Sequence, residues 1–162
     1  MLELMYSTGL RVSELVGLRL KNLDLDGRFV RVIGKGDKER IAPLTETAVG
    51  QLRRYLERHK VGASAGEWMF PGGTPGSHIT RQAFWQKIKK YAEQAGIASR
   101  VTPHTLRHSV ATHLIMNGAS VAEVSEILGH SKLDTTMIYT HLDSAHLKQV
   151  VKECHPRERS RK

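Results

Sequence analysis

The hydrophobic pattern of the chain is dominated by apolar positions spaced three or four residues apart, which is typical of amphipathic helices. Short breaks rich in glycine, serine or threonine separate these stretches, so the sequence predicts several short helices. The predicted helices cover residues 1–7, 11–18, 45–59, 80–95, 103–117 and 121–128, with one more around 147–151.

Two stretches have the composition and length of strands instead, residues 28–33 and 39–43. Gly34-Lys35-Gly36-Asp37 lies between them, and this glycine-rich connection predicts an antiparallel hairpin. Residues 18–26 are predicted to be a polar connector. The predicted fold class is therefore mainly α with a small antiparallel β-sheet (α+β).

Helix boundaries are marked most clearly between residues 101 and 141, where capping residues and glycines follow one another. Serine or threonine caps a helix start, proline suits the first helical position, and glycine favours the left-handed conformation that ends a helix. Three short helices are predicted here in succession. Their boundary signals are Thr102-Pro103, Gly118, Ser120 with Glu123, Gly129, and Ser131 with Asp134.

The 162-residue length is that of one domain with room for a core. We expect that domain to span residues 1–153 and a charged, disordered tail to follow over 154–162. The single cysteine, Cys154, excludes an internal disulfide and fits a reducing cytoplasm.

A net charge of +9, from 25 Lys+Arg against 16 Asp+Glu, favours a polyanionic partner, although a solvated basic surface would look the same. No apolar run approaches the roughly 18 residues of a membrane span, and no signal peptide is recognisable. We expect a soluble, cytoplasmic protein with no membrane partner.

Candidate chemistry gathers in the same well-punctuated region. His104 and Arg107 lie three residues apart, on a helix face other than that of Leu106, Val110 and Leu114. His130 and Tyr139 follow. An arginine fork, imidazoles and a phenol suit a tetrahedral phosphorus centre, at which tyrosine can be a covalent nucleophile. A nucleotide-binding GxxxxGK[ST] loop and a paired-carboxylate site for two metal ions are both missing.

Two other motifs are weaker. His104 and His108 are spaced as HxxxH, but a zinc-protease HExxH motif needs glutamate where Thr105 stands, and the cation of Arg107 opposes a metal. Residues 62–66 fit GxSxG, yet they follow a helix and a polar linker rather than the strand that a hydrolase nucleophile requires.

With these motifs in order, the sequence resembles the catalytic domain of the tyrosine recombinases (phage-integrase family), and is most like their Xer-type members. The resemblance spans roughly residues 4–142 and rests on separated motifs: Thr8-Gly9-Leu10-Arg11, the IGKGDKER hairpin, His104-x-x-Arg107, Leu128-Gly129-His130 and Tyr139.

The resemblance implies site-specific cleavage and rejoining of double-stranded DNA through a 3′-phosphotyrosyl intermediate, with no ATP, metal or other cofactor. Tyr139 would attack the scissile phosphate, and Arg11 and Arg107 would hold its nonbridging oxygens. Lys35 would protonate the leaving 5′-oxygen. His104 and His130 would bind the phosphate and assist proton movement, in roles that the sequence does not divide.

The resemblance also implies a larger assembly in the prokaryotic nucleoid. The usual N-terminal DNA-clamping domain is absent, so we expect a catalytic-domain fragment or truncated product. Leu147, Val150 and Val151 form a stripe too small to anchor its helix. In the full-length protein this C-terminal helix would dock on a neighbouring subunit of a DNA-bound tetramer.

Two alternatives share some of these features. Type IB topoisomerases have a similar active site, but they relax supercoiled DNA as monomers and do not prefer a recombination site. A transcriptional regulator could use residues 120–141 as a helix-turn-helix. Such a regulator would not need Arg11, Lys35 and Tyr139 together.

Overall fold

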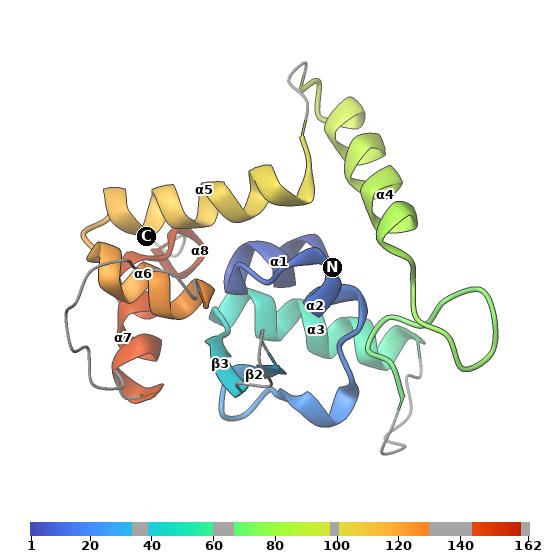
Figure 1. Ribbon diagram of the computed structural model, residues 1–162, viewed down its shortest axis with the longest axis horizontal. Coiled ribbons are helices and arrows are strands. Elements are labelled where there is room, and N and C mark those ends of the chain that lie inside the picture. The colour runs from blue at the N-terminus through green and yellow to red at the C-terminus, as the bar shows by residue number, and fades with distance from the viewer. Residues whose placement is uncertain (34–38, 60–66, 98–100, 130–143, 160–162) are drawn as a thin grey trace.

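The computed structural model describes residues 1–33, 39–59, 67–97, 101–129 and 144–159. Helix α1 (Leu2–Thr8) lies between α5 (Pro103–Met116) and α3 (Glu46–His59), and α4 (Arg81–Gln94) extends away from the sheet (Figure 1). The mainly helical fold with a small antiparallel sheet is confirmed. Its elements are α1 (Leu2–Thr8), α2 (Val12–Val16), the 3₁₀ turn η1 (Leu20–Asn22), β1 (Leu23–Asp24), β2 (Phe29–Ile33), β3 (Glu39–Pro43), α3 (Glu46–His59), α4 (Arg81–Gln94), α5 (Pro103–Met116), α6 (Val121–Leu128), α7 (Ser144–Cys154) and α8 (Pro156–Arg159).

The predicted helix ends are confirmed where the structure describes them. Thr102 Oγ1 accepts the Thr105 N–H at 3.1 Å, and Ser120 Oγ accepts the Glu123 N–H at 3.2 Å. Gly129 ends α6 with φ 64°, in the left-handed region that favours glycine. The start predicted at Ser131 lies outside the described residues.

The three strands pair in the order β1-β2-β3, all antiparallel. Val30 and Val32 of β2 are buried and lie opposite Ala42 and Arg40 of β3. Strand β1 was not expected, because residues 18–26 were predicted to be a polar connector. That prediction is wrong over β1, whose two residues are too few for an alternating pattern to show.

Two apolar clusters form the core. The larger joins α1, α2, the sheet, α3 and α4, and the smaller joins α5, α6 and α7. Leu147, Val150 and Val151 of α7 are buried in the smaller cluster, beside Val110 and Leu114 of α5. The expectation that this stripe is too small to anchor its own helix is therefore wrong, because α5 and α6 supply the rest of the apolar surface.

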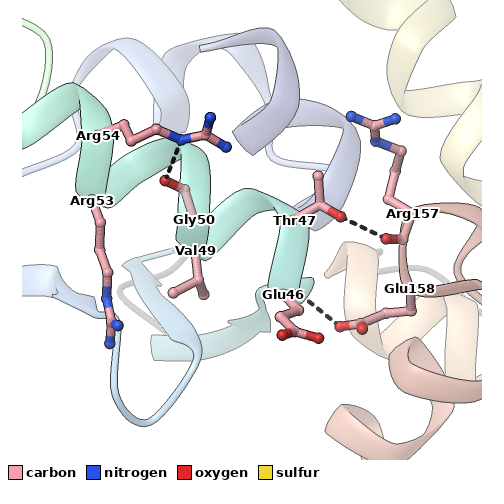
Figure 2. A pocket seen from close by; sticks show the side chains of 8 residues that line it. All are labelled: Glu46, Thr47, Val49, Gly50, Arg53, Arg54, Arg157 and Glu158. Atoms are coloured by element: carbon pink, nitrogen blue, oxygen red, sulfur yellow. Dashed lines mark hydrogen bonds between the residues drawn. The ribbon is translucent and has the colours of Figure 1, made fainter. Parts of the chain in front are cut away.

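The tail predicted to be disordered from Cys154 onward is instead helical over most of its described residues, which belong to the end of α7 and to α8. His155 is completely buried, and its Nε2 lies 3.0 Å from the Tyr6 carbonyl oxygen. The Glu158 carboxylate accepts the Glu46 N–H at the start of α3, and Thr47 donates to the Arg157 carbonyl (Figure 2). These specific contacts hold α8 despite its charged composition, which alone had suggested disorder.

The described helices are all too short or too polar to cross a membrane.

Candidate active site

Arg107 is the most deeply placed cation of the site. It lies in the second turn of α5 and is only 8% exposed. Its Nη1 donates to the Gly9 carbonyl, and its Nη2 donates to the Leu128 carbonyl at 2.7 Å. The prediction that Arg107 lies on a helix face away from the core is therefore wrong. Two backbone carbonyls from distant segments accept hydrogen bonds from the guanidinium, and these bonds compensate for the cost of burying its charge.

Electrostatics make this position favourable for an anion. Burial, together with the neighbouring cations of Arg11 and Arg40, lowers the pKa of Arg107 to about 10, although the Glu14 carboxylate acts in the opposite direction. At neutral pH the guanidinium is still charged. A bound anion would relieve the repulsion among these cations.

Arg11 approaches the same place from the turn between α1 and α2. Its Nη2 donates to the Gly129 carbonyl at 2.8 Å, and its Nη1 lies 3.0 Å from Glu14 Oε1. Gly9 makes the turn with φ 60°, and a Cβ there would lie 2.2 Å from the Leu128 side chain. Glycine is therefore needed at position 9 both for its conformation and for its close contact with α6.

Arg40 is a third arginine that the sequence analysis did not single out. Its Nη2 lies 2.9 Å from Glu14 Oε2, the oxygen that also accepts the Arg11 backbone N–H at 2.7 Å. We call this group of four side chains the arginine cluster: Arg11, Arg40, Arg107 and Glu14. It holds three cations and one carboxylate, so its formal charge is positive.

The arginine cluster surrounds the C-terminal end of α6. The carbonyls of Ile127, Leu128 and Gly129 accept hydrogen bonds from Arg40, Arg107 and Arg11, respectively. Helix-end carbonyls lack intrahelical partners and carry the negative end of the helix dipole, so cations are favoured there. The cluster thereby fixes the residue that immediately precedes His130.

The structure describes three of the six predicted site residues, Arg11, His104 and Arg107. Arg11 and Arg107 are brought together, although they are distant in sequence. His104 lies one turn before Arg107 in α5 and is exposed. Lys35, His130 and Tyr139 lie outside the described residues.

Within the described ranges, no three His, Cys, Asp or Glu side chains gather so that they could hold a metal ion. The described site offers guanidinium N–H groups instead. Such forked donors match the oxygens of a phosphate.

Comparison with known proteins identifies the family of the chain. Residues 1–146 match the model of the phage integrase family. Tyrosine recombinase XerD of Listeria monocytogenes serotype 4b (strain F2365) is 48% identical over 161 residues, which are 97% of this chain and 54% of the relative. XerD of Pseudomonas aeruginosa PAO1 is also 48% identical, over 160 residues covering 97% of this chain and 53% of that protein. The chain thus spans about half the length of these curated relatives.

Solved structures agree. The crystal structure of XerA recombinase superposes with a TM-score of 0.74 at 33% identity, over 95% of this chain and 55% of that one. XerH site-specific recombinase bound to its difH substrate, in a pre-cleavage complex, gives a TM-score of 0.72 at 28% identity, over 93% of this chain and 44% of that one. The predicted resemblance to Xer-type recombinases is confirmed, and the chain belongs to the phage integrase family.

Proposed function

We propose that this chain is the catalytic domain of a site-specific tyrosine recombinase, which cleaves and rejoins double-stranded DNA. The observation that carries the proposal is the convergence of Arg11 and Arg107 at the end of α6, where cations outnumber carboxylates. Family membership and the net charge of +9 support it.

In the proposed reaction, the Tyr139 hydroxyl gives up its proton with the assistance of His104 or His130, and its oxygen attacks the scissile phosphorus. A P–O bond to tyrosine forms as the P–O5′ bond breaks. Lys35 gives a proton to the leaving 5′-oxygen. Arg11 and Arg107 donate to the nonbridging oxygens, whose charge grows in the transition state. The 5′-hydroxyl of a new strand reverses these steps, so the ester bond is conserved without ATP.

His104 and His130 are proposed to bind the phosphate and assist proton movement. His104 is exposed on the first turn of α5. His130 follows Gly129, whose carbonyl accepts from Arg11. These positions support contact with an anion held at the arginine cluster.

Strand exchange between two duplexes requires four cleavages, so we propose a tetramer on DNA for the full-length protein, acting in the prokaryotic cytoplasm. The expected exchange of a C-terminal helix would not use the stripe of α7, which is buried in this chain. The polar contacts of α8 make it the better candidate. Arg157 pairs with Glu3 at 2.8 Å on the surface of α1, and surface pairs of this kind cost little to exchange.

The direct experiment incubates the 162-residue chain with nicked suicide duplexes and looks for a covalent protein–DNA adduct on denaturing gels. We expect an adduct at a 3′-phosphate on duplexes carrying a recombination site. Relaxation of supercoiled DNA without any site preference would instead indicate a type IB topoisomerase. Binding without an adduct would indicate a DNA-binding regulator.

A further inference from the structure

Arg40 reaches the arginine cluster from the buried face of the sheet. It lies directly opposite Val32 in the β2–β3 register, and residues opposite each other in an antiparallel pair share a face. Val32 is buried, and the Arg40 side chain is only 12% exposed. A charged side chain thus occupies a position at which the sheet elsewhere presents apolar residues.

The contacts of Arg40 are close but incomplete. Nη2 bonds Glu14, whereas Nη1 reaches the Ile127 carbonyl only at 3.4 Å. The buried Nε makes no hydrogen bond to any of the described residues. The side chain also lies directly against Gly129, where an added Cβ would be 2.2 Å from Nε.

This arrangement is unfavourable for stability alone. Burial lowers the pKa of Arg40, and the cation of Arg11 lowers it too, while Glu14 acts in the opposite direction. Buried ion pairs are often no more stabilising than apolar side chains of similar size, and a buried N–H without an acceptor adds a cost. Retaining a guanidinium here is better explained by what it holds in place.

The held group is the Glu14 carboxylate. Oε2 accepts from both Arg40 and the Arg11 backbone, which leaves Oε1 directed at the Arg11 guanidinium. Apart from Arg11, Arg40 is the only described partner of the Glu14 carboxylate. Without Arg40, no contact from β3 would restrain the rotation of this carboxylate.

We propose that Arg40 is a positioning residue: through Glu14 and Gly129 it fixes the Arg11 guanidinium at the phosphate site. The proposal rests on the proposed function for the identity of the anion. Arg40 also links the two segments that bear the other expected groups, because β3 follows residues 34–38 and Gly129 precedes residue 130. The Arg40 side chain can thereby keep Arg11 in a fixed position relative to both segments.

The first test does not depend on activity. In the free 162-residue chain, ¹⁵N NMR reports the rotation of each guanidinium about its Nε–Cζ bond. We expect slow rotation of Arg11 in the wild type and faster rotation in Arg40→Lys and Arg40→Met, because neither variant has a fork to hold Glu14. Arg107 should rotate slowly throughout, since two backbone carbonyls hold it. The matched control, Arg31→Lys on the exposed face of β2, should leave Arg11 unchanged.

Thermal unfolding separates positioning from folding. If positioning is the role, Arg40→Met should fold with a Tm no lower than the wild type. Two results would overturn the proposal: unchanged rotation of Arg11 in both variants, or failure of both variants to fold.

The second test measures single-turnover cleavage of a nicked duplex together with DNA affinity. Arg40→Lys should cleave about 100-fold more slowly, the scale expected for a misplaced catalytic group, with Kd unchanged. In a Glu14→Gln background the same substitution should have little further effect, because the shared carboxylate is already altered. Additive losses would contradict action through Glu14. If the wild type forms no adduct, the proposed function fails, while the NMR result still decides the role of Arg40.

Discussion

The arginine cluster and the C-terminal contact region around α8 both bring charged groups together from distant segments, but their charge balance differs. In the arginine cluster, the one carboxylate pairs with Arg11 and Arg40, and the described acceptors of Arg107 are neutral backbone carbonyls. Excess positive charge is thereby left beside an exposed part of Arg11.

Around α8, each described pair matches one cation with one carboxylate. Arg157 pairs with Glu3, and Arg28 pairs with Glu158 (Figure 2 shows the neighbouring contacts of Glu158). These pairs hold α8 against α1 and against the turn before β2. The contrast indicates that matched charges hold the fold together, whereas the unmatched cations of the arginine cluster are available to an anion.

The largest effect is expected from Lys35→Ala. Loss of a general acid should slow cleavage of an ordinary duplex by about 100- to 10,000-fold. A 5′-bridging sulfur leaves without a proton, because thiols have a pKa of about 8.5, so this substrate should restore most of the rate. An equal defect on both substrates, in a folded variant, would assign the proton to another donor.

Arg107→Lys tests the unmatched cations themselves. Losing donors to the growing phosphate charge should lower the cleavage rate by about 100- to 1000-fold, since an ammonium cannot replace the fork. The burial and cations that lower the pKa of Arg107 to about 10 should also lower that of a lysine. The remaining activity should therefore fall as the pH rises, because the lysine loses its proton. A lysine variant with wild-type activity at all pH values would show that net charge alone matters.

The pH dependence of stability tests the contact region around α8 through the buried His155. Burial lowers the pKa of His155 below 6.5, although the Tyr6 carbonyl bond and nearby carboxylates oppose the shift. The unfolded chain then binds a proton more readily than the folded one, so the free energy of unfolding should fall as the pH drops below about 6.5. Chemical denaturation should show a smaller fall in His155→Gln. An identical pH dependence in the two proteins would contradict a buried neutral imidazole.

The smallest effect is expected from Arg157→Gln. The Arg157–Glu3 pair is partly exposed, so its loss should lower the free energy of unfolding by less than about 1 kcal/mol. Cleavage should be unchanged, because this pair does not touch the arginine cluster. Arg53→Gln, which breaks the more exposed pair with Asp26, is the matched control and should change stability still less. A large loss of cleavage in Arg157→Gln would end the distinction between the two regions.

Helix ends and the two strands of the hairpin, β2 and β3, are predictable because their signals are local. Capping residues such as Ser120 and the left-handed Gly129 act within one turn of chain, and the sequence alone indicates them. The ordered α8 was missed for the opposite reason. Its stability depends on partners in α1 and α3, which composition cannot reveal.

The arginine cluster was only half predictable. Family motifs identify Arg11 and Arg107, but a charge is normally expected at the surface, and the carbonyls that accept Arg107 come from remote turns. Spacing did contain a clue, because Arg107, Val110 and Leu114 share a helical stripe. Arg40 was hidden in the charged run of residues 37–40. Strand alternation places it with Ala42, on the inward face, and could have found it.

In the proposed reaction, the arginine cluster holds a phosphate for attack by Tyr139. The most direct measurement traps the adduct on a nicked suicide duplex and maps the linked residue by peptide mass spectrometry. We predict linkage at Tyr139, and in Tyr139→Phe no adduct with nearly unchanged DNA affinity, since many phosphate contacts remain. An adduct that survives in Tyr139→Phe, or maps to Tyr6, Tyr55 or Tyr91, would show that Tyr139 is not the nucleophile.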